Sequence, residues 1–286
     1  MVPDVYRLFA PLKQTTAVVF ASPHSGCAYA PGFLAQSVLD TQAIRSSEDA
    51  FVDRLFDMAP DLGAPLLAAR VPRAFVDLNR APDELDPCLI EGIARAPHNP
   101  RVSSGLGVIP RVVAGGRAIY RGKLALAEAE ARIAGYWHPY HQALRRVLDA
   151  THAGFGEVVL IDCHSMPHEA IAGHTKTGAA RPEVVLGDRF GAAAGREVME
   201  QVEAAFSSAG FRVVRNTPFA GAFISQSYGR PSVRRHVVQV EIDRSLYMDE
   251  VRIEPLAGFA DFRHRLGGVV AEIADIGRQA LPLAAE

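Results

Sequence analysis

Two histidines each follow an apolar run of the kind found in buried strands. Residues 17–21 (AVVFA) precede His24 in the segment SPHSG, and residues 158–161 (VVLI) precede His164 in the segment DCHS. Continuous runs of this type suit strands buried on both faces of a parallel sheet. Because ligands bind beyond the carboxyl ends of such strands, we expect the fold to bring the two imidazoles together. A shared metal ion is the simplest chemistry that uses both.

A third ligand would be an acid. A catalytic zinc site keeps three protein ligands and leaves one position for water. Glu48 and Asp49 follow Ser46-Ser47, a pattern that predicts the start of a helix, and either acid could point toward the same sheet edge. Alternatively, both acids only favour the amino terminus of that helix electrostatically. No HExxH or HxxE spacing is present.

Glu241 is the strongest candidate for a general base. Residues 236–243 alternate, so Gln239, Glu241 and Asp243 share one face of a predicted strand, while Val240 and Ile242 face the core. A carboxylate in that position is unfavourable unless it is hydrogen-bonded or has a chemical role. A metal site needs a base beside its water. The alternative is an ion pair with Arg244 or Arg234.

Residues 73–80 (RAFVDLNR) end in Asn79-Arg80, a pair suited to binding a carboxylate. Arginine offers a planar fork of donors, and asparagine adds one more. The alternative is a surface salt bridge from Arg80 to Asp77 or Asp83, which would contribute little stability.

The order of predicted elements indicates an α/β fold with a mostly parallel or mixed sheet flanked by helices. We predict strands over 17–22, 65–70, 74–78, 157–162, 183–188, 211–215 and 236–243, and helices after Ser46 and over 124–150, 194–208 and 256–280. The loop over 81–117 is rich in Pro and Gly, and loops this long are usually binding segments or lids. No linker is evident, so we expect a single domain over 1–286.

Composition excludes several classes of function. The 286 residues carry 30 Lys+Arg against 32 Asp+Glu, a net charge of −2, with no basic stripe that would indicate nucleic-acid binding. No stretch approaches the ~18 apolar residues of a membrane span, and the amino end does not resemble a signal peptide. Three cysteines in no spaced pattern fit a reducing cytoplasm. The sequence contains no heptad repeat that would indicate a subunit interface, so it does not predict an oligomeric state.

Taken together, six segments resemble the N-formylglutamate amidohydrolase family: SPHSG, SEDAFVD, PRAFVDLNR, IYRGKL, LIDCHSMP and QVEIDRSLYMDE, spread over residues 22–250. That family is similar in fold to the zinc carboxypeptidases and aspartoacylases, which places the expected α/β architecture in the phosphorylase/hydrolase-like group. The resemblance implies a zinc-dependent amidohydrolase that cleaves N-formyl-L-glutamate to formate and L-glutamate, a step of histidine degradation.

The resemblance also implies roles for individual residues. It makes His24, Asp49 and His164 the ligands of one Zn²⁺ per chain, with Glu48 as the alternative to Asp49. Iron, cobalt or manganese would suit the same ligand types. Glu241 becomes the general base, and Arg73 polarises the scissile carbonyl. The remaining matched positions would contact the acidic substrate: Asn79, Arg80, Tyr120, Arg121 and Arg230.

Two alternatives to this function stay open at the level of sequence. One keeps the zinc site and changes the substrate to another N-acyl amino acid or a peptide terminus. The other is a non-catalytic binder of acidic metabolites on the same scaffold, which would need neither Glu241 nor the histidine pair.

Overall fold

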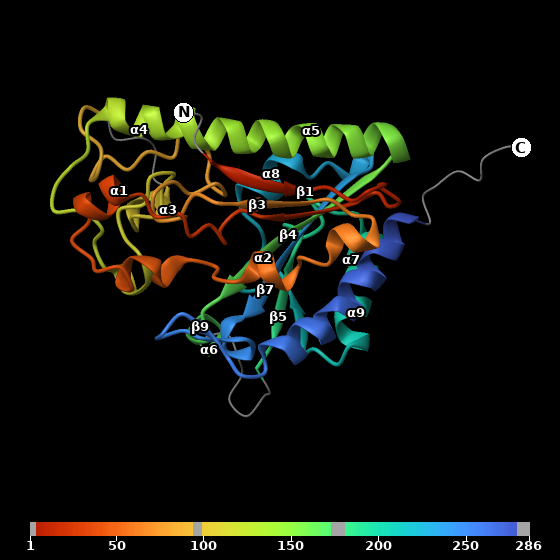
Figure 1. The fold of residues 1–286 in the computed structure, drawn as a ribbon. Coiled ribbons are helices and arrows are strands. Elements are labelled where there is room, and N and C mark those ends of the chain that lie inside the picture. Colours follow the sequence, from red (N-terminus) through yellow and green to blue (C-terminus); the bar gives the residue numbers. More distant parts are fainter. Residues whose placement is uncertain (1–3, 94–98, 173–180, 279–286) are drawn as a thin grey trace, which may run out of the picture.

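The computed structural model describes residues 4–93, 99–172 and 181–278, and they are built around a seven-stranded sheet (Figure 1). Its spatial order is β1-β3-β2-β4-β7-β5-β6. The strands are β1 (Tyr6–Phe9), β2 (Val18–Ser22), β3 (Leu66–Ala69), β4 (Val158–Met166), β5 (Val184–Gly187), β6 (Val213–Arg215) and β7 (Arg235–Asp243). A separate two-stranded ribbon pairs β8 (Met248–Asp249) with β9 (Glu254–Pro255).

The sheet is mixed, which confirms the predicted α/β class. The four central strands β3, β2, β4 and β7 run parallel to one another. At the edges, β1 runs antiparallel to β3, and β5 runs antiparallel to β7 while β6 is parallel to β5. Every residue of β2 and β4 is buried, as their continuous apolar runs require.

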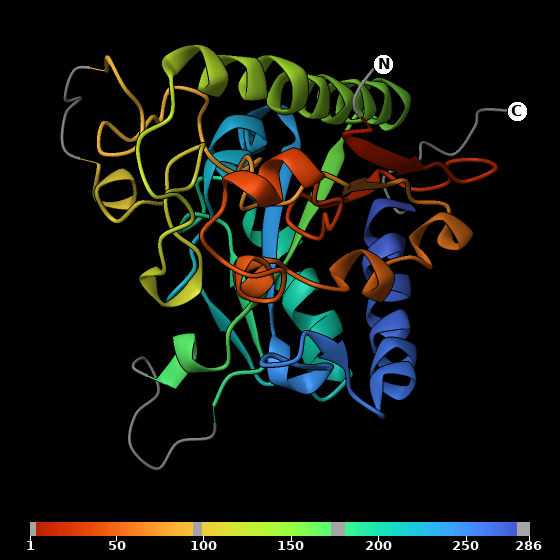
Figure 2. The ribbon, with the colours of Figure 1, turned by 60° about the vertical axis from the view of Figure 1, so that its left-hand side comes forward.

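Helices cover both faces of this sheet (Figures 1 and 2). On one face, α2 (Val52–Leu55), α7 (Arg196–Ser208) and α9 (Phe259–Arg278) pack against Phe20, Ile161 and Val240. On the other, α4 (Leu126–Arg132), a π-helical turn (Ile133–Trp137) and α5 (His138–Phe155) pack against Val19, Leu160 and Val237. Among the described residues, no helix combines the length and apolar character that crossing a bilayer would require.

Short helices occupy the connections between these layers. They are α1 (Pro31–Gln36), α3 (Pro100–Ser103), α6 (Glu169–Ala172) and α8 (Phe223–Tyr228). The predicted helix over 124–150 is confirmed as α4 and α5, and its interruption is the π-helical turn just before Pro139. Within 81–117, residues 94–98 lie outside the described part of the chain.

Two predicted elements are wrong. Residues 74–78 form turns rather than a strand, although the alternating Ala74, Val76 and Leu78 are indeed buried. The predicted helix start at Ser46 is also wrong, because the Ser46 Oγ donates backward to the Ala43 carbonyl within a 3₁₀ turn (Ala43–Ser47). The helix proper, α2, begins only at Val52, so Glu48 and Asp49 lie in the connection before it.

Candidate metal centre and substrate pocket

The predicted site residues converge at the carboxyl ends of three parallel strands. His24 follows β2, while His164 and Glu241 lie directly opposite one another in the register of β4 and β7. Gly26 lets the chain after His24 cross closely over residues 70–71, since a Cβ there would lie 2.1 Å from the Val71 carbonyl oxygen. The backbone therefore places both histidines at the same edge of the sheet.

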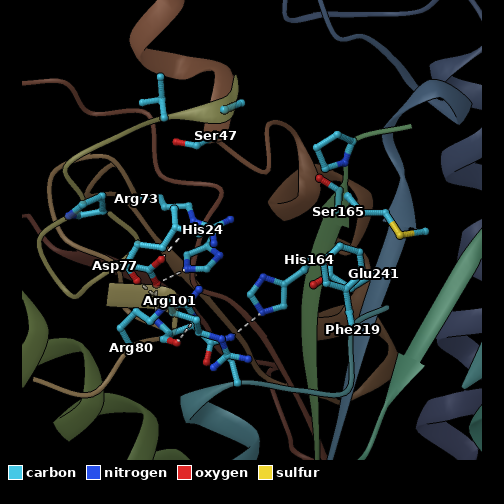
Figure 3. Close-up of a pocket in the computed structure, with 18 of the residues that line it drawn as sticks. His24, Ser47, Arg73, Asp77, Arg80, Arg101, His164, Ser165, Phe219 and Glu241 are labelled. Atoms are coloured by element: carbon cyan, nitrogen blue, oxygen red, sulfur yellow. Dashed lines mark hydrogen bonds and ion pairs between the residues drawn. The ribbon is translucent and has the colours of Figure 1, made fainter. Parts of the chain in front are cut away.

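His24, Asp49 and His164 are all buried and bring three potential ligand atoms together within 4.8 Å of one another. Figure 3 shows the rings of His24 and His164 near each other in the pocket, with Glu241 beside His164. The Asp49 Oδ2 atom lies 3.0 Å from His164 Nδ1 and 3.5 Å from His24 Nδ1. The two rings are 4.8 Å apart, centroid to centroid. These spacings are the ones expected of atoms that surround a single small cation.

The donor set fits a divalent metal ion. His24 Nδ1 is buried and has no hydrogen-bond partner among the described residues, which is unfavourable for a polar atom unless a ligand satisfies it. Two imidazole nitrogens and one carboxylate oxygen are the ligand types of catalytic zinc sites that keep an open position. The described residues thus present a three-ligand site that could hold a metal ion.

Two further carboxylates lie at the far ring nitrogens of the histidines, and sequence reasoning missed both. Asp77 Oδ1 lies 2.7 Å from His24 Nε2, and Asp162 Oδ1 lies 3.1 Å from His164 Nε2. In metal sites a carboxylate on the far ring nitrogen fixes the tautomer that leaves the near nitrogen free to bind. For Asp162 the signal was present, because a residue two positions before His164 on a strand shares its face.

Asp49, and not Glu48, faces the two histidines. Arg244 Nη2 donates to Asp49 Oδ1 at 2.9 Å, which turns the other oxygen toward the histidines. Burial raises the pKa of Asp49, but the hydrogen bond from His164 and the nearby charges of His24 and Arg73 outweigh it and hold the pKa well below its usual value. Glu48 instead accepts two hydrogen bonds from Arg45 and one from Tyr29, away from the histidine pair.

Glu241 lies beside this triad in a setting suited to proton transfer. Its side chain is 9% exposed and lines the pocket. Burial raises the pKa of Glu241 to about 7, although the positive charges of His164 and Arg73 act in the opposite direction. Gln239 Nε2 donates to Glu241 Oε1 at 2.9 Å, and the other carboxylate oxygen has no hydrogen-bond partner among the described residues.

The pocket that contains these groups has a volume of about 560 Å³ and a cationic wall. Four guanidinium groups line it: Arg73, Arg80, Arg101 and Arg244. Arg73 Nε donates to Asp77 Oδ2 at 3.2 Å, and Arg244 is paired with Asp49. Within the described ranges, the Arg101 side chain has no hydrogen-bond or ion-pair partner. The pocket therefore suits an anionic ligand.

Asn79 and Arg80 reach the site in different ways. The Asn79 amide is engaged by the protein, because its Oδ1 accepts from the Ile224 N–H at 2.8 Å and its Nδ2 lies 3.3 Å from Asp162 Oδ2 and 3.1 Å from His164 Nε2. Arg80 donates through Nε and Nη1 to the carbonyls of Leu106 and Asn79. Its Nη2 has no partner in the part of the chain described. Burial is the main factor that lowers the pKa of Arg80, and the nearby Arg73 and Arg101 lower it further.

Three predicted substrate contacts are not brought to the pocket. The Tyr120 hydroxyl accepts a hydrogen bond from buried Arg132, in an aromatic cluster with Phe33. Arg121 and Arg230 are exposed, and Arg230 pairs through its backbone with Arg235 at the opposite end of β7 from Glu241. None of the three is among the described residues that line the pocket, so their contact with the substrate stays a prediction.

Comparison with known proteins gives concordant matches. The family model for N-formylglutamate amidohydrolase matches residues 16–248. The N-formylglutamate deformylase of Pseudomonas aeruginosa is 32% identical over 90% of this chain and 91% of its own length. That of Pseudomonas putida is 29% identical over 82% of this chain and 82% of its own length. A crystal structure of N-formylglutamate amidohydrolase from Ralstonia eutropha JMP134 superposes with a TM-score of 0.90 at 34% identity, covering 98% of this chain and all of that one.

Proposed function

The chain belongs to the N-formylglutamate amidohydrolase family, and from that premise we propose that it hydrolyses N-formyl-L-glutamate to formate and L-glutamate with a bound divalent metal ion. The juxtaposition of the three-ligand site with Glu241, in a pocket walled by arginines, supports this proposal most directly. A protein that merely binds acidic metabolites needs neither a metal site nor a buried carboxylate beside it.

His24, Asp49 and His164 would hold the metal ion, with zinc as the ion their chemistry suits best. When bound, such an ion would polarise the formyl oxygen and lower the pKa of the attacking water toward ~7. Asp77 and Asp162 would keep the two imidazoles oriented, and Arg244 would keep Asp49 turned toward them.

Glu241 would perform the proton transfers. Its free oxygen takes a proton from water as the water oxygen bonds to the formyl carbon. The same carboxyl group then gives that proton to the nitrogen while the C–N bond breaks, which leaves the free amine of glutamate and formic acid, which ionises to formate. Arg73, whose Nε donates to Asp77, would donate to the oxygen that becomes negatively charged. Such an interaction typically stabilises the transition state by ~3 kcal/mol.

Arg80 would anchor a carboxylate of the substrate through its unpaired Nη2, and Asn79 would support the site by holding Asp162 and the Ile224 backbone. An anion beside Arg80 relieves the repulsion among Arg80, Arg73 and Arg101 that lowers the Arg80 pKa. A charge-assisted hydrogen bond of this kind holds the amide at attack distance.

The function is tested by formate release from the zinc-loaded protein. N-formyl-L-glutamate should be cleaved faster than N-formyl-L-glutamine, which has a neutral side chain, and faster than N-acetyl-L-glutamate. Preference for the acetyl or a peptidyl substrate would favour the hydrolase of other acyl groups. Glutamate binding without any hydrolysis would instead show a non-catalytic binder.

In the same assay, Arg80→Met should raise KM for N-formyl-L-glutamate by about 10- to 100-fold with little change in kcat, because one hydrogen bond to a charged group is lost. Arg196→Met is the matched control, since the exposed Arg196 lies on α7, outside the pocket lining. Its KM should stay within about twofold of the wild-type value. Equal effects of the two substitutions would exclude Arg80 as the anchor.

The pH dependence follows from the raised pKa of Glu241. The base acts only when ionised, so kcat/KM should rise with pH and level off above about 7. Below the pKa, each pH unit removes about nine-tenths of the ionised form. A bound cation would lower the pKa further, which sets about 7 as the upper limit for this limb. Initial rates from pH 5 to 9 measure this dependence. A kcat/KM that decreases as the pH is raised from 5 to 7 would contradict the assignment.

A further inference from the structure

Gln239 is a buried polar residue of the pocket, and the mechanism so far uses only its NH₂ group, which holds Glu241. It lies on β7 two residues before Glu241, on the same face, while Val238 and Val240 on the opposite face belong to the hydrophobic core. The Gln239 side chain is 4% exposed and lines the pocket. Its amide is therefore part of the pocket wall next to the proposed base.

The hydrogen bond to Glu241 fixes which way the Gln239 amide points. An ionised carboxylate can only accept, so the amide must present its NH₂ group, and Nε2 does donate to Glu241 Oε1 at 2.9 Å. The carbonyl oxygen, Oε1, is then turned away from Glu241. That oxygen is buried and has no hydrogen-bond partner among the described residues.

Within the described strands β4 and β5, the residues opposite Gln239 supply no side-chain donor for this oxygen. On β4 the residue opposite Gln239 is Asp162, whose carboxylate accepts hydrogen bonds, and on β5 it is Gly187, which has no side chain. A Cβ on Gly187 would lie 2.7 Å from the carbonyl carbon of Ala220, so that strand and the pocket loop around Ala220 are in close contact. A buried acceptor without a protein donor is unfavourable, which indicates a donor on the ligand.

We propose that Gln239 Oε1 accepts a hydrogen bond from the N–H of the scissile formamide while Gln239 Nε2 holds Glu241, a proposal that rests on the proposed function. Glu241 returns its proton to that same nitrogen, so the nitrogen must come within hydrogen-bond reach of the Glu241–Gln239 pair. Gln239 would thus align the nitrogen and its proton donor through one amide group.

This contact would strengthen during the reaction. The substrate N–H is a neutral donor, whereas the protonated leaving amine is a cationic donor and makes a stronger hydrogen bond. An interaction that is stronger in the transition state than in the bound substrate raises kcat rather than lowering KM. Gln239 should therefore affect turnover of amides more than their binding.

The test compares N-formyl-L-glutamate with its ester counterpart, the O-formyl derivative of 2-hydroxyglutarate, which lacks the N–H. Gln239→Met keeps the length of the side chain and removes both hydrogen bonds. We expect kcat for the amide to fall about 30-fold more than kcat for the ester, after correction for uncatalysed ester hydrolysis, with metal content unchanged. Gln201→Met, on α7 and outside the pocket lining, should leave both rates at wild-type values.

A second variant keeps the proposal testable if Gln239→Met does not fold. Gln239→Glu retains oxygen acceptors but places a like charge beside Glu241, so both rates should fall while the amide-to-ester ratio stays within about threefold of wild type. Equal losses on amide and ester in Gln239→Met would overturn the acceptor role. Absence of formate release from the amide by the wild-type protein would contradict the proposed function itself.

Discussion

Replacing Glu241 with glutamine should lower kcat for formate release by about 10³-fold, within the range typical of general acid–base groups. Glutamine keeps the shape of the side chain but can neither take a proton from water nor return it to the amine nitrogen. Because Glu241 is not one of the three residues that offer ligand atoms, the variant should still bind one metal ion per chain. Steady-state kinetics and elemental analysis of the same preparation measure both quantities.

The pocket of this variant should remain intact. None of the described arginines that line the pocket hydrogen-bonds to Glu241, so binding of L-glutamate, the product, should change by less than about threefold. Calorimetric titration with L-glutamate provides that control. A Glu241→Gln protein that retains more than a tenth of the wild-type kcat would show that another group is the base.

Asp49→Asn should abolish stable metal binding. The rate of formate release should therefore fall by at least about 10³-fold. The substitution removes the one negative charge shared by His24 and His164, and asparagine is a weak ligand for zinc. It also leaves the buried Arg244 without its carboxylate partner, which should lower the thermal midpoint as well. Metal content after gel filtration is the primary measurement, and circular dichroism checks that the fold persists.

Glu48→Gln is the matched control for that experiment, since it changes the neighbouring acid of the same segment. Its carboxylate bonds Arg45 and Tyr29 rather than the histidines, so metal content should stay at the wild-type level. A modest loss of stability is expected, because both charge-assisted hydrogen bonds to Arg45 weaken. Loss of metal in Glu48→Gln with retention in Asp49→Asn would reverse the ligand assignment.

Local patterns were sufficient for the strands that carry the histidines. The runs before His24 and His164 are continuous because β2 and β4 lie in the middle of the sheet, where both faces are covered. The alternation in residues 236–243 likewise places Gln239 and Glu241 on one face of β7. These features depend on near neighbours in the chain and on burial, and both leave a signature in sequence.

Errors arose where burial occurs without regular structure. Ala74, Val76 and Leu78 are buried in alternation, which is the usual signature of a strand, yet the chain there is held by turns and by contacts such as Asp77 N–H to the Val108 carbonyl. Similarly, Ser46 and Asp49 resemble the start of a helix. Ser46 lies instead in the 3₁₀ turn (Ala43–Ser47), and Asp49 lies in the connection after it, where its N–H donates to the carbonyl of His24.

Spatial relations between distant segments were beyond the reach of periodicity. Tyr120, Arg121 and Arg230 have side chains suited to an anionic substrate, but the tertiary structure directs Tyr120 to Arg132 and leaves the two arginines outside the pocket lining. Arg101, which has the same chemistry, lines the pocket from a short helix in the long loop. Residue type alone cannot distinguish these positions.

Sequence by itself determined the α/β class, the strand ends that bear His24 and His164, and the acid-bearing strand of Glu241. The tertiary structure decided that β4 and β7 pair with His164 opposite Glu241. It also decided that Asp49 rather than Glu48 faces the histidines, and that the carboxylates of Asp77 and Asp162 lie at their far ring nitrogens. The reason is physical. Local conformation follows from propensity and burial of adjacent residues, whereas strand order, register and the partner of each buried charge depend on how the whole chain packs.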